Sequence, residues 1–292
     1  MADIKKKHAK KRSQGAEIWR RLRKNKGAMV GLAITILIIL LSLFADVIFD
    51  FDTQIAGINA KERLLAPTQG HPFGTDQMGR DLFYRVLYGT KYSFAIGILS
   101  TLMCTSIGLP LGAMAGYLGG TFDDILMRII DIISSIPSML MGMLVVSALG
   151  PSLANLVIAF GVAGAPAIAR ISRASVMTVK NQEYIEAARA SGLREGKIIV
   201  SHILPNCLSP ILVAMTLQVA QSIISASGLS FLGLGVPVPS PEWGALLSAG
   251  RQYIRDYSYM CLFPGLAIVV CVLALNMLGD GLRDAMDPKL RK

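Results

Sequence analysis

Long apolar runs separated by shorter polar segments dominate this sequence. Six runs approach or exceed the length of a transmembrane helix, and they cover residues 28–49, 92–117, 124–149, 152–169, 207–232 and 260–281. A helix needs about 20 mostly apolar residues to cross the hydrocarbon core of a bilayer. The third and fourth runs are separated only by the short link at Gly150-Pro151. The pattern predicts an all-α polytopic membrane protein with six transmembrane helices.

Composition supports the same class. Hydrophobic residues make up 53% of the 292 residues and charged residues only 16%, whereas a soluble domain carries about 25% charged residues. The first run is too long for the core of a signal peptide, so we expect it to remain as a spanning helix. The four cysteines lie in or at the ends of apolar runs without metal-ligand spacing, which favours buried free thiols (Cys104, Cys207, Cys261 and Cys271).

The positive charge is concentrated at the N-terminus. Residues 1–26 contain eleven Lys and Arg residues and two acidic residues, and this accounts for nearly all of the net charge of +10. A nucleic-acid-binding tail is disfavoured because the segment runs directly into an apolar helix. Cationic residues beside a span resist translocation and attract anionic headgroups. We therefore predict a basic cytoplasmic tail over residues 1–27 that contacts membrane lipids and no nucleic acid.

The loops agree with this orientation. With six spans, both chain ends lie inside, including a C-terminal tail over residues 283–292. Residues 170–206 contain six Lys and Arg residues against three acids and are expected inside, whereas residues 46–91 contain five against six and are expected outside. The predicted division is the basic tail, a first helix with an extracytoplasmic loop (28–91), a transmembrane core (92–282) and the C-terminal tail.

The sequence lacks the patterns of a catalytic chain. It has only three histidines and no zinc-binding spacing, and no nucleophile elbow is present. The nearest phosphate-loop match, Gly192 to Ile198, is one residue short and lacks the Ser or Thr that would hold Mg²⁺. We predict no enzyme activity, no metal site and no cofactor in this chain.

Charged residues cluster at the start of the third span. Asp123, Asp124, Arg128 and Asp131 lie there, and Arg128 and Asp131 have the spacing to pair on one helix face. The middles of the spans lack the ionisable groups that mark ion-coupled carriers. The energy for any transport is therefore expected to come from another subunit.

The inner loop 170–206 has a helix-forming stretch from Tyr184 to Ala190, and Gly192 is placed to end that helix. A second stretch is expected to stop at Pro205, where the next span begins. The result would be a short helix parallel to the membrane, whose small side chains allow another protein to approach closely. An ordinary amphipathic surface loop is the alternative.

Four motifs give this chain a resemblance to a known family. Glu186-Ala187-Ala188, Gly192 and Leu204-Pro205 resemble the EAA loop of ABC-importer permeases, and the surrounding His202-Ile-Leu-Pro-Asn form is typical of the oligopeptide, dipeptide and nickel branch. Segments 71–81, 230–244 and 276–288 are similar to other motifs of that branch. The basic tail suits its second, C-type permease subunit.

The resemblance implies a type I ABC-importer permease fold in a bacterial or archaeal cytoplasmic membrane. It implies a heterodimer with a homologous permease, two ATPase subunits that bind ATP and Mg, and an extracytoplasmic substrate-binding protein. The residues implied to couple to the ATPase are Tyr184, Glu186, Ala187, Ala188, Arg189, Ser191, Gly192, Leu204 and Pro205. The implied outer-loop motif comprises Gly74, Asp76, Gly79, Arg80 and Asp81.

Oligopeptides or dipeptides are the first expectation for the cargo, and nickel or a metal chelate is the second. An ion-coupled secondary carrier and a scaffold or membrane enzyme are the readings from other classes. A polar stripe on the fifth span suggests where cargo would pass, since Gln218, Gln221, Ser222 and Ser225 share one helix face near Met215. The stripe either lines the translocation path or hydrogen-bonds to another helix.

Overall fold

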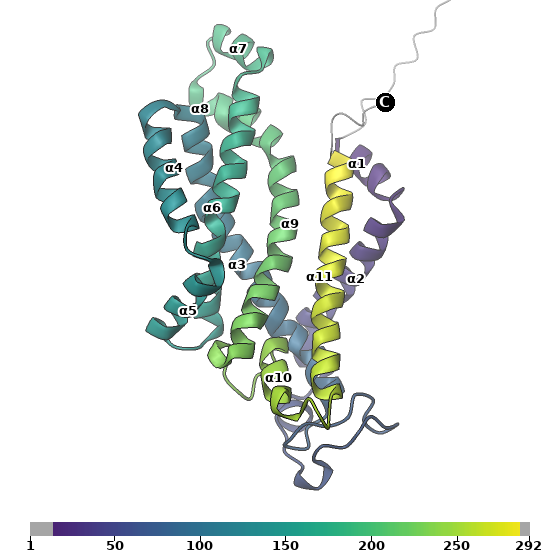
Figure 1. Ribbon diagram of the computed structural model, residues 1–292. Helices are drawn as coiled ribbons and strands as arrows, with labels where there is room; N and C mark the ends of the chain where they lie inside the picture. Colours follow the sequence, from purple (N-terminus) through teal and green to yellow (C-terminus); the bar gives the residue numbers. More distant parts are fainter. Residues whose placement is uncertain (1–13, 287–292) are drawn as a thin grey trace, which may run out of the picture.

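The computed structural model describes residues 14–286 and is a bundle of long helices (Figure 1). Five helices are long and apolar enough to cross a membrane. They are α2 (Lys26–Ile48), α3 (Leu82–Leu118), α6 (Leu153–Lys180), α9 (Leu204–Leu229) and α11 (Tyr259–Met286). A sixth crossing is possible if the bent pair α4 (Gly120–Ser134) and α5 (Ser138–Leu149) forms one span. Residues 14–286 form no β-strand, which confirms the all-α class.

Four shorter α-helices lie between and before the spans, together with short 3-10 and π-helical turns. They are α1 (Gln14–Leu22), α7 (Glu183–Ala190), α8 (Glu195–Ile198) and α10 (Trp243–Gly250). Figure 1 shows that α1 and the end of α11 lie at the same end of the bundle as α7, whereas α10 lies at the opposite end. The part of the basic tail over residues 1–13, and residues 287–292 of the C-terminal tail, lie outside the described residues.

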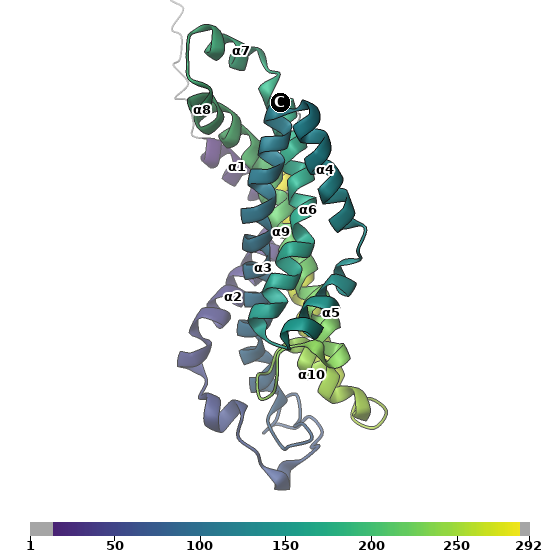
Figure 2. The same ribbon diagram turned by 90° about the vertical axis from the view of Figure 1, so that its left-hand side faces the viewer.

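The third span is bent, which corrects the single helix expected over residues 124–149. Helices α4 and α5 meet at 77° across a break of three residues, visible in Figure 2. Pro137 is the last residue of the break, and a proline disfavours helical geometry in the residue before it. The hydroxyl of Ser134 also donates to the carbonyl of Ile130, and that of Ser135 donates to Ile132. Such bonds compete with helix continuation.

The second span begins ten residues before its expected start at residue 92. Asp81 caps α3 by accepting a hydrogen bond from the Phe83 amide, at 2.8 Å. The charged residues in the first turns had suggested a loop, but Lys91 pairs with Asp46 of α2 at 2.6 Å. Arg85 is buried and donates to the carbonyl of Ile55 at 2.6 Å. Partners distant in sequence thus allow charge within this helix.

The charges of α4 also pair differently from the prediction. Asp131 pairs with Arg170 at 3.0 Å, not with Arg128, and Asp123 pairs with Arg173 through two hydrogen bonds. Both arginines lie on α6, which extends eleven residues beyond its expected end at residue 169. The acidic residues at the start of the third span therefore fasten α4 to α6.

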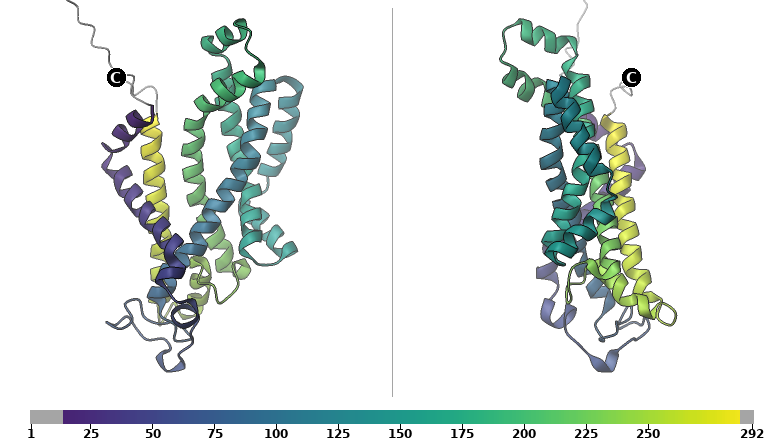
Figure 3. Two further views of the ribbon diagram at one scale, coloured as in Figure 1. Left: turned by 180° about the vertical axis from the view of Figure 1, so that it is seen from behind. Right: turned by 60° about the vertical axis from the view of Figure 1, so that its left-hand side comes forward.

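Three glycines bring α3 and α6 into backbone contact. Gly108, Gly112 and Gly116 recur at every fourth residue of α3, so they share one face of the helix. A Cβ atom at Gly112 would lie 2.1 Å from the carbonyl oxygen of Ala169. Small residues at this spacing permit close packing of helices in membranes. In Figure 3 α3 runs obliquely through the bundle beside α6, and α11 packs along α2.

The four cysteines are free thiols, as predicted. Cys104, Cys207 and Cys271 are buried, and Cys261 is half-buried.

Candidate functional sites

The predicted helix of the inner loop is present as α7, and it projects from one end of the bundle (Figure 1). Its side chains divide into an anchor and a free face. Ile185 is buried and Ala188 half-buried. The free face consists of exposed residues that the sequence assigned to ATPase coupling, namely Tyr184, Glu186 and Ala187. Arg189 of the same set is exposed but contacts Tyr117 and Glu195. An exposed face on an anchored helix can be offered to another protein without losing the fold.

Gly192 ends α7 as the sequence predicted. Its backbone has φ of +77°, a left-handed conformation that favours glycine. The Gly192 amide donates to the carbonyl of Arg189 at 2.9 Å, and the Leu193 amide donates to Ala188 at 3.3 Å. Ser191, also in the predicted coupling set, is exposed and donates its hydroxyl to Ala187 at 2.8 Å.

A buried cluster continues from α7 into the spans. Ile185 and Ile198 of the inner loop pack with Val176 of α6 and with Cys207 and Ile211 of α9. Protein interiors are close-packed and transmit displacement. A movement of α7 would therefore be carried to the ends of α6 and α9.

One residue of the inner end, Tyr117, was missed by the sequence analysis. It lies in the last turn of α3, where Arg189 of α7 places its guanidinium 6.0 Å from the ring centre and 3.4 Å from the hydroxyl. Lys180 donates to the Tyr117 carbonyl at 3.1 Å, and Glu195 accepts from Arg189 at 3.1 Å. Tyr117 and Arg189 are 72 positions apart, and the sequence between them contains no pattern that links them.

The second stretch of the inner loop does not stop at Pro205. Helix α8 passes through a π-helical turn, Ile199–Ile203, straight into α9. Pro205 lies in the first turn of α9, directly after the π-helical turn in which the Leu204 amide donates to the carbonyl of Ile199. Leu204 and Pro205 thus belong to the start of the fifth span. Pro205 lines a cavity between α9 and α1, away from the free face of α7.

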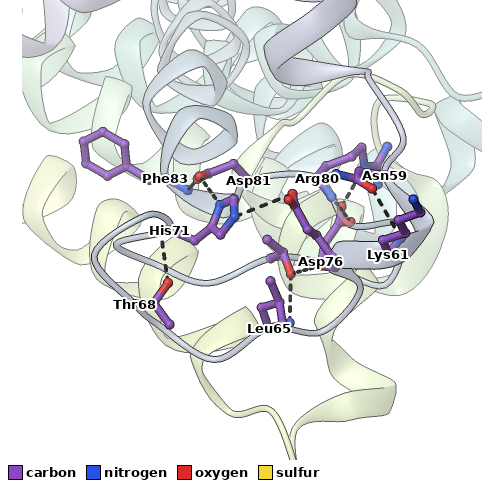
Figure 4. A network of polar contacts seen from close by, with 11 residues as sticks. Asn59, Lys61, Leu65, Thr68, His71, Asp76, Arg80, Asp81 and Phe83 are labelled. Atoms are coloured by element: carbon purple, nitrogen blue, oxygen red, sulfur yellow. Dashed lines mark hydrogen bonds and ion pairs between the residues drawn. The ribbon is translucent and has the colours of Figure 1, made fainter.

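The five outer-loop residues lie in one folded segment before α3, and Figure 4 shows Asp76, Arg80 and Asp81 of this set. Asp76 accepts from the Arg80 side chain at 2.7 Å and from the Met78 and Arg80 amides. Asp76 and Arg80 are only 3% and 4% exposed. The buried charges of this segment therefore pair with each other and stabilise the loop from within.

Two glycines and a histidine complete this loop. Gly74 and Gly79 both have positive φ, and a Cβ at Gly79 would lie 1.8 Å from the carbonyl oxygen of Asn59. His71 Nδ1 lies 2.8 Å from Asp81 Oδ2, so the carboxylate that caps α3 also holds the loop (Figure 4). The motif residues are thus explained by the shape of the loop.

At the end of the bundle that carries the outer loop, α10 is hydrogen-bonded to α3. The Trp243 ring N–H donates to the carbonyl of Val86 at 2.9 Å, and its amide donates to the Ser93 hydroxyl at 3.1 Å. Glu242 is fully buried and accepts from the amides of Gly244 and Ala245, each at 2.9 Å. Burial raises the pKa of the Glu242 carboxyl. Helix α3 therefore touches α7 at one end and α10 at the other.

The polar stripe of the fifth span borders a cavity of about 140 Å³ between α9, α6 and the start of α5. Gln218 donates to Ser222, and Gln221 donates to Ser225, each at 3.4 Å within α9. Ser222 is buried, whereas Gln221 is exposed. Gly164 of α6 leaves the room for the Gln218 amide, since a Cβ there would lie 2.7 Å from its nitrogen.

Met215 does not line this cavity. It packs instead against the buried cluster beneath α7. Among residues 14–286, no group of three His, Cys, Asp or Glu side chains is placed to hold a metal ion.

Comparisons with known proteins cover nearly the whole chain. The family profile described as "Binding-protein-dependent transport system inner membrane component" matches residues 108–292. A second profile, "N-terminal TM domain of oligopeptide transport permease C", matches residues 13–67. Together they include the inner loop, the polar stripe, α1 and α2.

Characterised relatives match at close to full length. The dipeptide transport system permease protein DppC of Alkalihalophilus pseudofirmus is 43% identical over 94% of this chain and 90% of the relative. The oligopeptide transport system permease protein OppC of Bacillus subtilis is 40% identical over 93% and 88%. The glutathione transport system permease protein GsiD of Pectobacterium atrosepticum is 40% identical over 96% and 93%.

Solved structures show the same fold. The methionine ABC transporter MetNI, in an inward-facing conformation, matches with a TM-score of 0.60 and 20% identity. The match covers 70% of this chain and 98% of the solved chain.

Proposed function

This chain belongs to the family of binding-protein-dependent transport system inner membrane components, and from that membership we propose that it is the C-type permease of an ATP-driven importer of dipeptides or oligopeptides. The observation that supports a peptide as the cargo is the sequence identity to the dipeptide and oligopeptide permeases over nearly the whole of each chain. The glutathione permease, whose cargo is also a small peptide, points the same way.

The importer would contain further subunits. We infer a homologous permease that completes the path, two ATPase subunits and an extracytoplasmic binding protein. The end of the bundle that carries α7 would then face the cytoplasm, in line with the basic loop 170–206. ATP and Mg would be bound by the ATPase subunits, and the chain itself would perform no hydrolysis.

Coupling would pass from α7 into the spans. The free face of α7, with Tyr184, Glu186 and Ala187, would seat in the ATPase, and closure of the ATPase pair would displace this helix. The buried cluster beneath Ile185 and the Arg189–Tyr117 contact would carry the displacement to α6, α9 and α3. Because α3 also holds α10, a shift of α3 reaches the opposite side of the membrane. This is an element with two positions that nucleotide binding biases.

The cargo would pass along the polar stripe of α9. Gln218, Gln221, Ser222 and Ser225 offer amide and hydroxyl groups that could exchange their bonds to one another for bonds to peptide groups. Their bonds at 3.4 Å are long for hydrogen bonds, so little is lost when they are exchanged. Weak, replaceable contacts suit a path that must release what it binds.

Reconstitution tests the proposed function. The permease pair, the ATPases and the binding protein are placed in proteoliposomes, and uptake of a labelled dipeptide is measured with ATP and with a non-hydrolysable ATP analogue. Uptake is expected only with ATP and the binding protein. Uptake that follows an ion gradient without ATP would contradict the proposal. Import of nickel without import of any peptide would show that the cargo is nickel and not a peptide.

A further inference from the structure

Helix α1 lies against the bundle at the end that carries α7. Leu22 is buried with Ala28 of α2 and Ala285 of α11, and Ile18 packs against them. Trp19 is 47% exposed on the same short helix. A helix with one apolar anchoring side, an exposed tryptophan and cationic residues is typical of the membrane interface.

The polar side of this element carries unbalanced positive charge. Arg20, Arg23, Lys24 and Lys26 are exposed, and none of them pairs with an acidic side chain of residues 14–286. Arg21 is different, because it pairs with Glu17 at 2.7 Å. Four cations within seven residues therefore face outwards beside the first span.

Two adjoining cavities open beside α1. The smaller, of about 490 Å³, is lined by Arg20, Arg21, Lys24, Asn25, Gly281 and Asp284. The larger, of about 680 Å³, continues between α1 and α9, and its apolar lining includes Ile18, Ile171, Val213 and Leu217. Arg21 and Ala285 line both cavities, so the two lie next to each other.

We propose that these neighbouring cavities bind one anionic phospholipid, whose phosphate sits between Arg20 and Lys24 and whose acyl chain lies against the apolar side chains between α1 and α9. The smaller cavity has the size and the net positive charge for a headgroup, since Arg20 and Lys24 face one carboxylate, Asp284, while Arg21 is paired with Glu17. The larger offers the apolar side chains of Ile18, Ile171, Val213 and Leu217 to a hydrocarbon chain, and Glu17 and Arg283 also line it. Basic residues at a membrane surface attract anionic lipid by about 1 kcal/mol each.

A lipid fits this place better than a protein segment. The exposed Trp19 precedes Arg20 in the chain, and the cations of the polar cavity sit where the chain enters its first span. A helix from another subunit would neutralise Arg20 and Lys24 only if it carried acidic side chains at matching positions. A phosphate group supplies that charge and accepts several hydrogen bonds at once.

Lipid retention tests the site on the intact importer complex. The complex is reconstituted in nanodiscs of phosphatidylcholine with phosphatidylglycerol, extracted into detergent, and analysed by native mass spectrometry for phosphatidylglycerol bound per chain. The double variant Arg20→Gln, Lys24→Gln should retain about 25-fold less, because each removed charge is worth about fivefold. The exchange Arg20→Lys, Lys24→Arg should keep the lipid.

A matched control loses the same charge at the other end of the molecule. Lys61→Gln with Arg255→Gln removes two exposed cations from the end that carries α10, and it should retain phosphatidylglycerol like the unchanged complex. Equal retention in the Arg20, Lys24 variant and in this control would overturn the proposal.

A second measurement identifies the occupant. A photo-crosslinking amino acid is placed at position 206, because Asn206 lines the larger cavity and is exposed. A phospholipid adduct is expected. An adduct to a partner subunit alone would overturn the lipid assignment in favour of a protein interface. Neither outcome depends on which peptide the importer carries.

Discussion

At the scale of single residues, a substitution at Gly192 should change the conformation of the coupling loop without a steric clash. A Cβ at Gly192 would meet no atom of the described residues within 4 Å, yet its φ of +77° disfavours any side chain. We expect Gly192→Leu to cost about 1–2 kcal/mol locally, to leave insertion intact, and to lower ATP-driven uptake by about tenfold. Gly196→Leu is the matched control, because Gly196 is equally open but has no positive φ. Normal uptake and ATPase stimulation in Gly192→Leu would show that this turn does not couple.

Glu242 should make stability depend on pH. Burial raises its pKa in the folded protein above the ordinary value of 4.5. The folded state then binds the proton more tightly than the unfolded state, so stability is fully present below pH 4.5 and is lost as the pH rises through the raised pKa. Thermal unfolding followed from acid to mildly alkaline pH should show this fall. In Glu242→Gln the fall should be smaller, even though the amide caps α10 less well; an unchanged slope would refute the assignment.

At the scale of elements, α3 and α6 should behave as one unit because their backbones touch. Gly112→Ala would place a Cβ 2.1 Å from the Ala169 carbonyl oxygen, so the helices must separate. Overpacking costs about 1–3 kcal/mol, and we expect a fall of about 5 °C in the midpoint of thermal unfolding. Gly265→Ala in α11 is the control, since its nearest contact would be an ordinary 3.9 Å from Leu247. Equal midpoints for the two variants would mean that α3 and α6 are not held by this contact.

At the scale of the whole molecule, alternating access predicts that the polar stripe changes its exposure with the nucleotide state. We expect Gln221→Cys, in a chain without its natural cysteines, to react with a small water-soluble thiol reagent at a rate that changes when ATP is trapped. Ile224→Cys is the control, since Ile224 is an exposed apolar residue on the same helix and should face lipid. Protection of position 221 in every nucleotide state would leave helix packing as the role of the stripe.

The sequence by itself determined what depends on local chemistry. The apolar runs predicted the spans, because a helix must cover the bilayer with its own side chains. The helix-forming stretch before Gly192 predicted α7 and its end. A left-handed backbone conformation favours glycine for local steric reasons that do not depend on the rest of the fold. The motif around Glu186 indicated the family because its residues are close together in the sequence and can be recognised without the fold.

Only the tertiary structure decided the features that join distant residues. Helix α3 starts at Leu82 because Asp46 and Ile55 provide partners for Lys91 and Arg85, and no local pattern contains them. Tyr117 meets Arg189, and α1 meets α9 around a shared cavity, only once the spans have packed. Close packing and charge pairing depend on distances in space, and a linear pattern does not record those distances.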